Sequence, residues 1–144
     1  MEADRAEALA EAVRHACRGF APLRLRAERI GFFPNNRLPR VVWVGVRDQQ
    51  NQLPELQDAV QAATQSFTAE EPEGRFTGHV TLARIKGIRR SEADVLTKAA
   101  SAMAEKLFGE WTANEVEIMR SELSPQGAKY TSLAAAPLHE DIPM

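Results

Sequence analysis

The sequence predicts an α+β fold in which helices pack against mainly antiparallel sheets. Two observations support this prediction. Apolar residues recur at helical spacing in three segments, whereas five other segments alternate or run together in the manner of strands. These segments follow one another in the order α-β-β-α-β-α-β-β, and a short turn joins the last two strands into a hairpin.

The first half of the chain supplies two helices and the two strands between them. A helix is predicted over residues 6–20, where apolar side chains recur every three or four positions. Residues 23–28 alternate between apolar and charged, as in a half-exposed strand. After the turn-rich stretch 31–39, the nearly continuous apolar run 41–46 predicts a buried strand, and a second helix is expected over 53–63.

The second half begins with a predicted loop over residues 70–74, which leads into a strand over 76–84. Ser91 and Asp94 resemble a capping box, which predicts that a third helix begins there and continues to Leu107. The closing hairpin consists of a strand around Val116 and Ile118, a turn over 124–127 and a last strand over 130–135.

The length and composition are those of one globular domain, with 144 residues of which 44% are hydrophobic and 26% charged. We expect a single domain over residues 1–138, followed by a frayed tail over 139–144. The net charge of −2 is too mild to indicate nucleic-acid binding through bulk charge. The first 50 residues, however, carry nine arginines against six carboxylates, which leaves room for a local basic patch.

The single cysteine, Cys17, cannot form an internal disulfide, which favours a reducing compartment and a buried structural thiol. No apolar run approaches the roughly 20 residues of a membrane helix, and the charged N-terminus is unlike a signal peptide. We therefore expect a soluble, cytoplasmic protein that makes no contact with a membrane.

The candidate chemistry lies in residues 76–84, which read Phe-Thr-Gly-His-Val-Thr-Leu-Ala-Arg. Side chains two apart on a strand share a face, so His79 and Thr81 are expected side by side while Val80 and Leu82 point into a core. A histidine can move a proton near neutral pH, and a neighbouring hydroxyl can hold a phosphate oxygen. This pair therefore suits chemistry on a phosphodiester.

Four stretches of the chain, taken in order, carry a resemblance to a known family. They are Phe20-Ala-Pro-Leu-Arg-Leu, Gly31-Phe-Phe-Pro-Asn with Pro39-Arg-Val-Val-Trp-Val-Gly-Val, the His79-x-Thr81 strand, and Met119-Arg-Ser-Glu-Leu-Ser-Pro-Gln-Gly-Ala-Lys-Tyr. Together they resemble the 2H phosphoesterase superfamily, specifically the bacterial RNA 2′,3′-cyclic phosphodiesterase (2′-5′ RNA ligase-like) family. The resemblance implies a 2H phosphoesterase-like fold and a reaction that opens a 2′,3′-cyclic phosphate to a 2′-phosphomonoester, with no metal and no cofactor. The expected substrate is RNA or a nucleotide with a cyclic phosphate end.

Family members carry two His-x-Thr motifs, one in each of two similar lobes, whereas this chain has one. The resemblance places the first motif in a strand before the first helix, so this chain looks like the family fold without its first β-α-β unit. Neither His15 nor His139 substitutes for the missing histidine, because neither is followed by the required threonine. Losing one acid–base partner removes a factor of about 10²–10⁴ in rate. A homodimer would cover the exposed strand edges and bring a second His79, so we expect one.

The resemblance makes His79 and Thr81 the expected catalytic residues, and Arg84, Trp43 and Tyr130 the expected substrate contacts. Strict alternation places Arg84 on the strand face opposite His79, unless the strand end twists. Trp43 fits a core position and a base-stacking position equally well. The cluster of Arg84, Lys86, Arg89 and Arg90 fits either a solvated loop or a guide for an RNA backbone.

Two alternatives stay open at this stage. The first is a non-catalytic protein that binds RNA or nucleotide ends through the retained half-site. The second is an assembly protein that keeps the fold as a scaffold. The sequence holds no nucleotide-binding glycine loop, metal-ligand cluster or Ser-His-Asp arrangement that would indicate a different class of enzyme.

Overall fold

A computed structural model describes residues 3–69 and 76–139 of the chain. The chain divides into two compact units. We call residues 3–23, 52–69 and 112–139 the hairpin unit, and residues 24–51 and 76–111 the sheet unit. The predicted loop over 70–74 lies outside the described residues.

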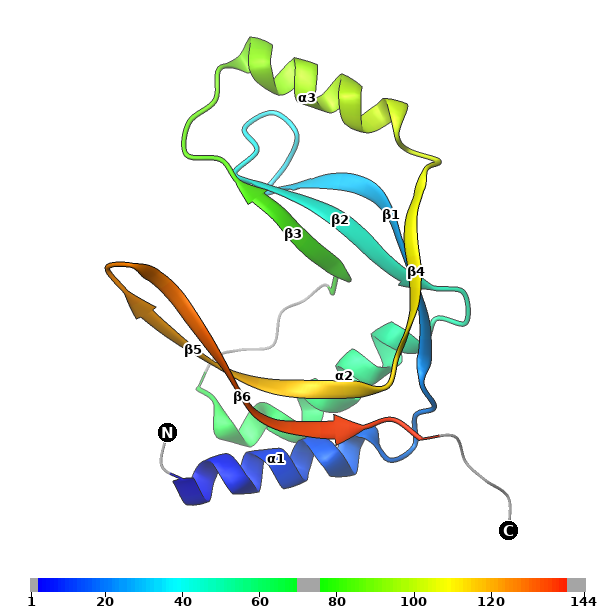
Figure 1. The fold of residues 1–144 in the computed structure, drawn as a ribbon, viewed down its shortest axis with the longest axis vertical. Helices are drawn as coiled ribbons and strands as arrows, with labels where there is room; N and C mark the ends of the chain where they lie inside the picture. Colours follow the sequence, from blue (N-terminus) through cyan, green and yellow to red (C-terminus); the bar gives the residue numbers. More distant parts are fainter. Residues whose placement is uncertain (1–2, 70–75, 140–144) are drawn as a thin grey trace. The chain divides into compact units, whose positions relative to one another are not determined.

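The hairpin unit consists of helices and one antiparallel pair of strands. Helix α1 contacts both helix α2 and strand β6, as Figure 1 shows. Strands β5 and β6 pair antiparallel from Glu115↔Pro137 to Ser124↔Gly127, with one register shift between Ile118 and Met119, and the predicted turn at 124–127 closes the hairpin. The elements are α1 (Ala3–Cys17), α2 (Gln52–Thr64), a short 3₁₀ helix (Gln65–Phe67), β5 (Glu115–Ser124) and β6 (Gly127–Pro137).

The predicted apolar stripe of the first helix is confirmed. Ala10, Val13 and Cys17 are buried on α1, and Leu56 is buried on α2. Burial raises the pKa of the Cys17 thiol above its usual value. The thiol therefore stays protonated at neutral pH and is a weak nucleophile, in agreement with the expected structural role.

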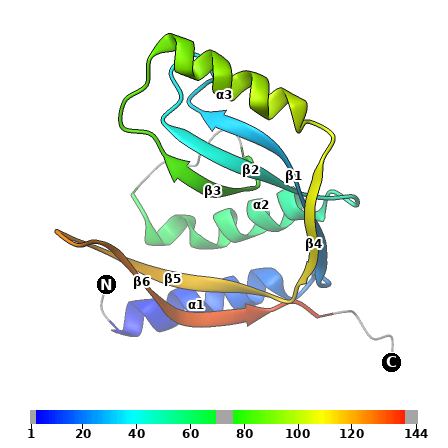
Figure 2. The same cartoon turned by 45° about the horizontal axis from the view of Figure 1, so that its top comes forward.

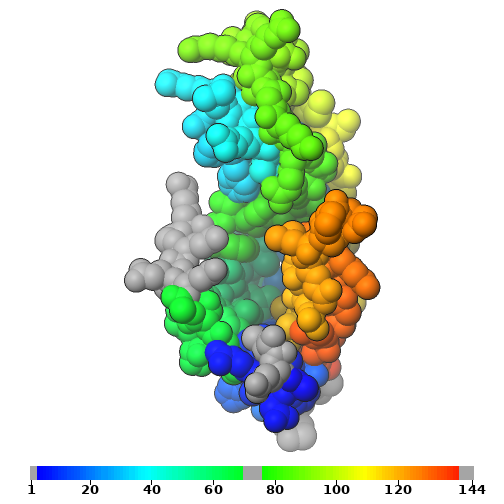
Figure 3. Space-filling model, turned by 90° about the vertical axis from the view of Figure 1, so that its left-hand side faces the viewer, coloured from blue at the N-terminus to red at the C-terminus, as the bar shows by residue number. Residues whose placement is uncertain are grey.

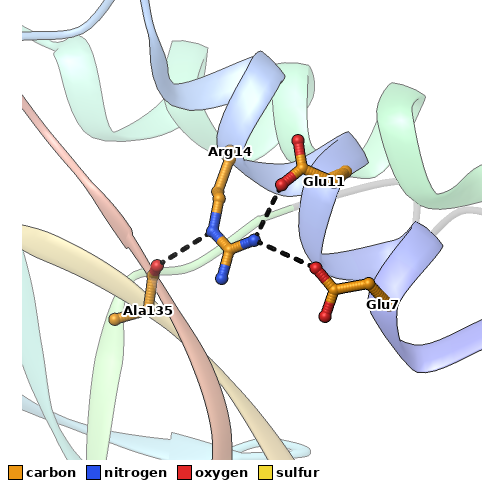
Figure 4. Close-up of polar contacts among 4 residues, drawn as sticks. All are labelled: Glu7, Glu11, Arg14 and Ala135. Atoms are coloured by element: carbon orange, nitrogen blue, oxygen red, sulfur yellow. Dashed lines mark hydrogen bonds and ion pairs between the residues drawn. The ribbon is translucent and has the colours of Figure 1, made fainter. Parts of the chain in front are cut away.

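Arg14 links α1 to the hairpin, as Figure 4 shows. Its Nε donates to the carbonyl oxygen of Ala135 on β6 at 3.4 Å. Its Nη1 lies 2.9 Å from a carboxylate oxygen of Glu11 and 3.6 Å from one of Glu7. Because the two carboxylates are exposed, each ion pair contributes less than about 1 kcal/mol, and the main effect is to orient the guanidinium toward β6.

The sheet unit is a four-stranded sheet with strand order β3-β2-β1-β4, together with one helix (Figure 2). β2 pairs antiparallel with both β1 and β3. Arg26 on β1 pairs with Glu110 on β4 through a 3.3 Å contact. The elements are β1 (Leu23–Phe33), β2 (Val41–Asp48), β3 (His79–Arg84), α3 (Arg90–Ala102) and β4 (Leu107–Ala113).

The structure corrects several predicted boundaries, since the first helix ends at Cys17 and the strand of the His-x-Thr pair begins at His79. The first strand continues through Phe33, because Gly31–Phe33 pair with β2 instead of starting a turn. The third helix begins one residue after Arg89, whose backbone N–H donates to the Glu92 carboxylate at 3.0 Å, so Ser91 and Asp94 are not its capping box. It also ends at Ala102, and Leu107 begins the strand β4, which sequence reasoning missed.

One hydrogen bond is found at the start of the predicted tail. The backbone N–H of His139 donates to the carbonyl oxygen of Phe20 at 3.1 Å. Residues 140–144 lie outside the described part of the chain.

Candidate active site

The His-x-Thr pair lies on β3, one of the two edge strands of the four-stranded sheet. His79 pairs with Gly45 of β2, and Thr81 pairs with Trp43. Paired residues of antiparallel strands share a face, so the imidazole and the hydroxyl belong to the same face, as predicted. Both residues are exposed. The pair is therefore accessible to a ligand along this face.

A backbone hydrogen bond orients the His79 ring. Its Nδ1 lies 2.7 Å from the carbonyl oxygen of Thr77. A carbonyl can only accept, so Nδ1 carries the hydrogen in this contact. In the neutral ring, Nε2 then keeps its lone pair and can accept a proton from water, as a general base requires.

Two aromatic rings support the imidazole from the same face. Phe33 meets His79 edge to face, with centroids 5.0 Å apart and an interplanar angle of 85°. Trp43 lies 5.0 Å from Phe33 and 6.0 Å from His79. The Trp43 ring passes over Gly31, where a Cβ would lie 2.5 Å from its Cε2 and closer still to its Cζ2. The aromatic cluster of Phe33, Trp43 and His79 thus depends on a missing side chain at Gly31.

Trp43 is half-buried. It therefore has partly the character of a core residue and partly that of an accessible ring, the two positions that the sequence left open. Its indole N–H is enclosed and has no hydrogen-bond partner among the described residues. Phe33 is not among the site residues predicted from the sequence. Once β1 is known to extend to Phe33, Gly31 and Phe33 stand two positions apart on one strand and share a face. Gly31 pairs with Trp43, so this is the face of Trp43.

The position of Arg84 differs from the one that strict alternation predicts. The register shifts between Val42 and Trp43, since Val42 pairs with Ala83 but Trp43 pairs with Thr81. Leu82 is therefore an extra residue, as in a β-bulge. Arg84 then pairs with Val41, which shares the face of Trp43, so the bulge returns Arg84 to the face of His79 and Thr81.

The expectation that Val80 and Leu82 point into a core is wrong. Val80 is 49% exposed and Leu82 is 56% exposed. All six residues of β3 are exposed. Alternation predicts which side chains share a face, but burial also requires a layer that covers that face.

Tyr130, the remaining predicted substrate contact, belongs to the hairpin unit. It pairs with Ser121 across the β5–β6 hairpin and is 64% exposed. Its placement on the closing hairpin agrees with the sequence prediction, and its side chain is open to solvent.

Neither a metal-binding cluster nor a membrane-spanning helix occurs in the part of the chain that the structure describes. Residues 3–69 and 76–139 contain no group of three or more His, Cys, Asp or Glu side chains that could hold a metal ion. Within the same ranges, no helix has both the length and the apolar character needed to cross a membrane.

Residues 1–125 match the family model of the 2′-5′ RNA ligase superfamily. The chain belongs to this superfamily. The fold agrees, because a solved structure from Thermus thermophilus, TT0787, aligns with a TM-score of 0.74 at 26% identity and covers 99% of this chain and 74% of that one. Escherichia coli LigT, solved with ATP, aligns over 97% of this chain and 71% of its own with a TM-score of 0.62 at 19% identity, which supports the fold alone.

Two curated proteins are similar to this chain in sequence. The RNA 2′,3′-cyclic phosphodiesterase of Methanothermobacter thermautotrophicus is 32% identical over 123 residues, which is 84% of this chain and 64% of the relative. That of Aeropyrum pernix is 34% identical over 114 residues, or 79% of this chain and 64% of the relative. The chain thus spans slightly less than two thirds of the length of these relatives.

Proposed function

We propose that this chain is a metal-independent phosphodiesterase-type protein that opens 2′,3′-cyclic phosphate ends of RNA or nucleotides. The observation that carries the proposal is the exposed His79 ring, whose Nδ1–H is held by the Thr77 carbonyl at 2.7 Å beside the Thr81 hydroxyl. Membership in the 2′-5′ RNA ligase superfamily and the names of its similar relatives support the same reaction.

In this proposal, Nε2 of His79 takes a proton from water as the water oxygen bonds to phosphorus. The bond from phosphorus to the ribose O3′ breaks, and O3′ takes up a proton from a second acid. The product is a 2′-phosphomonoester. The Thr81 hydroxyl donates to a non-bridging oxygen, and Arg84 offsets the negative charge from the same face.

We also propose that Trp43 and Tyr130 contact the substrate. The half-buried Trp43 ring stands next to His79 and can present its open part to a base or ribose. The proposal for Tyr130 rests on its exposed hydroxyl and on the resemblance of the closing hairpin.

The direct test is hydrolysis of 2′,3′-cyclic AMP in the presence of EDTA, with the products separated by chromatography. We expect turnover to 2′-AMP that EDTA does not inhibit. The absence of turnover over a wide range of protein concentration would instead favour a protein that binds nucleotide ends without reacting, because one His-x-Thr pair would then be an insufficient site.

A second proton carrier is needed, and we propose that a homodimer supplies it. Among the described residues, β3 lies at an edge of its sheet and has β2 as its one strand neighbour. Val80 and Leu82 expose 49% and 56% of their surface on this strand. Open strand edges with exposed apolar side chains favour association with another chain. A second copy on this edge would bring a second His79 to the site.

Light scattering coupled to size exclusion tests the homodimer. We expect a mass of twice the 16.0 kDa of the chain, and a shift toward the single-chain mass in Leu82→Lys, because a charge on β3 opposes burial of its edge. Val95→Lys is the matched control, since Val95 is 66% exposed on α3. A wild-type mass of 16.0 kDa at assay concentration would refute the dimer.

We also propose a cytoplasmic location. The support is chemical, because Cys17 is free and buried, as is common for proteins in a reducing compartment.

A further inference from the structure

A pocket lies in the sheet unit, beyond the end of β3. Its volume is about 540 Å³. It is formed by the loop before β2 and the loop after β3, which Figure 3 shows next to each other in cyan and green. The lining residues are Leu38, Pro39, Arg40, Ile85, Lys86, Gly87 and Ile88.

The pocket walls are held by hydrogen bonds that do not require a ligand. The backbone N–H of Ile85 donates to the Arg40 carbonyl at 2.8 Å, and the N–H of Arg40 donates to the Phe33 carbonyl at 2.8 Å. The Asn35 side chain accepts from the backbone of Arg37 at 2.9 Å and of Leu38 at 3.1 Å. Both loops are thus fixed through backbone groups, so side chains in the pocket can be replaced without breaking these bonds.

The charges of the pocket are positive. Arg40 and Lys86 both line it, both are exposed, and neither forms an ion pair with any residue in the described ranges. None of the lining residues is acidic. Leu38, Ile85 and Ile88 add apolar surface. Two free cations beside apolar walls suit a phosphate together with its sugar or base.

The distance from the His-x-Thr pair determines which phosphate can bind there. Lys86 lies five residues beyond Thr81, which is at most about 16 Å along an extended chain. Arg40 lies three residues before Trp43, the partner of Thr81, which is about 10 Å along a strand. One phosphate cannot occupy both places, and a 2′,3′-cyclic mononucleotide has a single phosphate. A strand of a few nucleotides carries further phosphates over this distance.

We infer that this pocket is a subsite for a backbone phosphate a few nucleotides away from the reacting end. The inference rests on the proposed function, in which the cyclic phosphate lies at His79. It makes the preferred substrate an oligoribonucleotide with a 2′,3′-cyclic end, and the mononucleotide a poorer one.

The kinetic test compares 2′,3′-cyclic AMP with a tetra-adenylate that ends in a 2′,3′-cyclic phosphate. In the double variant Arg40→Gln/Lys86→Gln, we expect kcat/KM for the tetranucleotide to fall about tenfold or more, with the value for 2′,3′-cyclic AMP unchanged within about twofold. Arg47→Gln/Lys98→Gln is the matched control. It removes the same charges from the sheet unit, and neither residue lines the pocket.

A binding test separates this inference from the proposed function. Fluorescence anisotropy of a labelled, non-cyclic tetra-adenylate is measured at several salt concentrations. The slope of log K against log salt is negative. For each phosphate that the Arg40→Gln/Lys86→Gln variant no longer neutralises, we expect the magnitude of this slope to decrease by about 0.7. If neither the wild type nor the variants hydrolyse either substrate, but the magnitude of this slope decreases in the Arg40→Gln/Lys86→Gln variant, the proposed function is wrong and the subsite stands. If the variant binds and reacts like the control, the subsite is refuted.

Discussion

Replacing His79 with asparagine is expected to lower the hydrolysis rate of 2′,3′-cyclic AMP by about 10²–10⁴-fold. Asparagine keeps an N–H that can donate to the Thr77 carbonyl, as Nδ1 does in the wild type at 2.7 Å. It has no counterpart of Nε2, so it cannot accept the proton of water. The measurement is kcat at saturating substrate, with circular dichroism and thermal unfolding to verify that the fold is retained.

His15→Asn is the matched control for this variant. His15 is an exposed histidine on α1 and has no threonine two positions further on. We expect its rate to equal that of the wild type. Equal rates for the His79→Asn variant and the wild type would show that another group carries the proton, and would remove the main support for the proposed mechanism.

Gly31→Ala is expected to lower the free energy of unfolding by about 1–3 kcal/mol, which is the usual cost of overpacking. The new Cβ would lie 2.5 Å from Cε2 of Trp43 and closer still to Cζ2. The indole ring must therefore move, and with it the aromatic support of His79, whose centroid lies 6.0 Å from that of Trp43. We expect lower activity together with lower stability, measured by urea unfolding and by the 2′,3′-cyclic AMP assay.

Gly109→Ala on β4 is the control, because a Cβ there meets no atom within 4 Å. We expect it to be neutral. The double variant Gly31→Ala/Trp43→Leu tests the cause, since a smaller side chain at Trp43 relieves the clash. Its loss of stability should be smaller than the sum of the two single losses. Additive losses would show that the clash with Trp43 is not the source of the destabilisation.

The elements predicted correctly are those whose signals are local. Turn residues at 124–127 place the hairpin between β5 and β6, and the apolar stripe of α1 needs only its own periodicity. β4 was missed because Met103 and Leu107 continue the helical spacing of α3. The alternation of Leu107, Gly109 and Trp111 is the competing strand signal, and a single sequence does not decide between the two.

The predictions about the candidate site also divide into those with a local sequence signal and those that depend on tertiary structure. The sequence by itself determined that His79 and Thr81 share a strand face, because side chains two apart on a regular strand do so. Its motifs also led to the correct family. Only the tertiary structure decided that the bulge at Leu82 returns Arg84 to that face, because the register depends on how β2 pairs with β3. It also decided that Val80 and Leu82 are exposed, since burial depends on a covering layer that no strand pattern encodes.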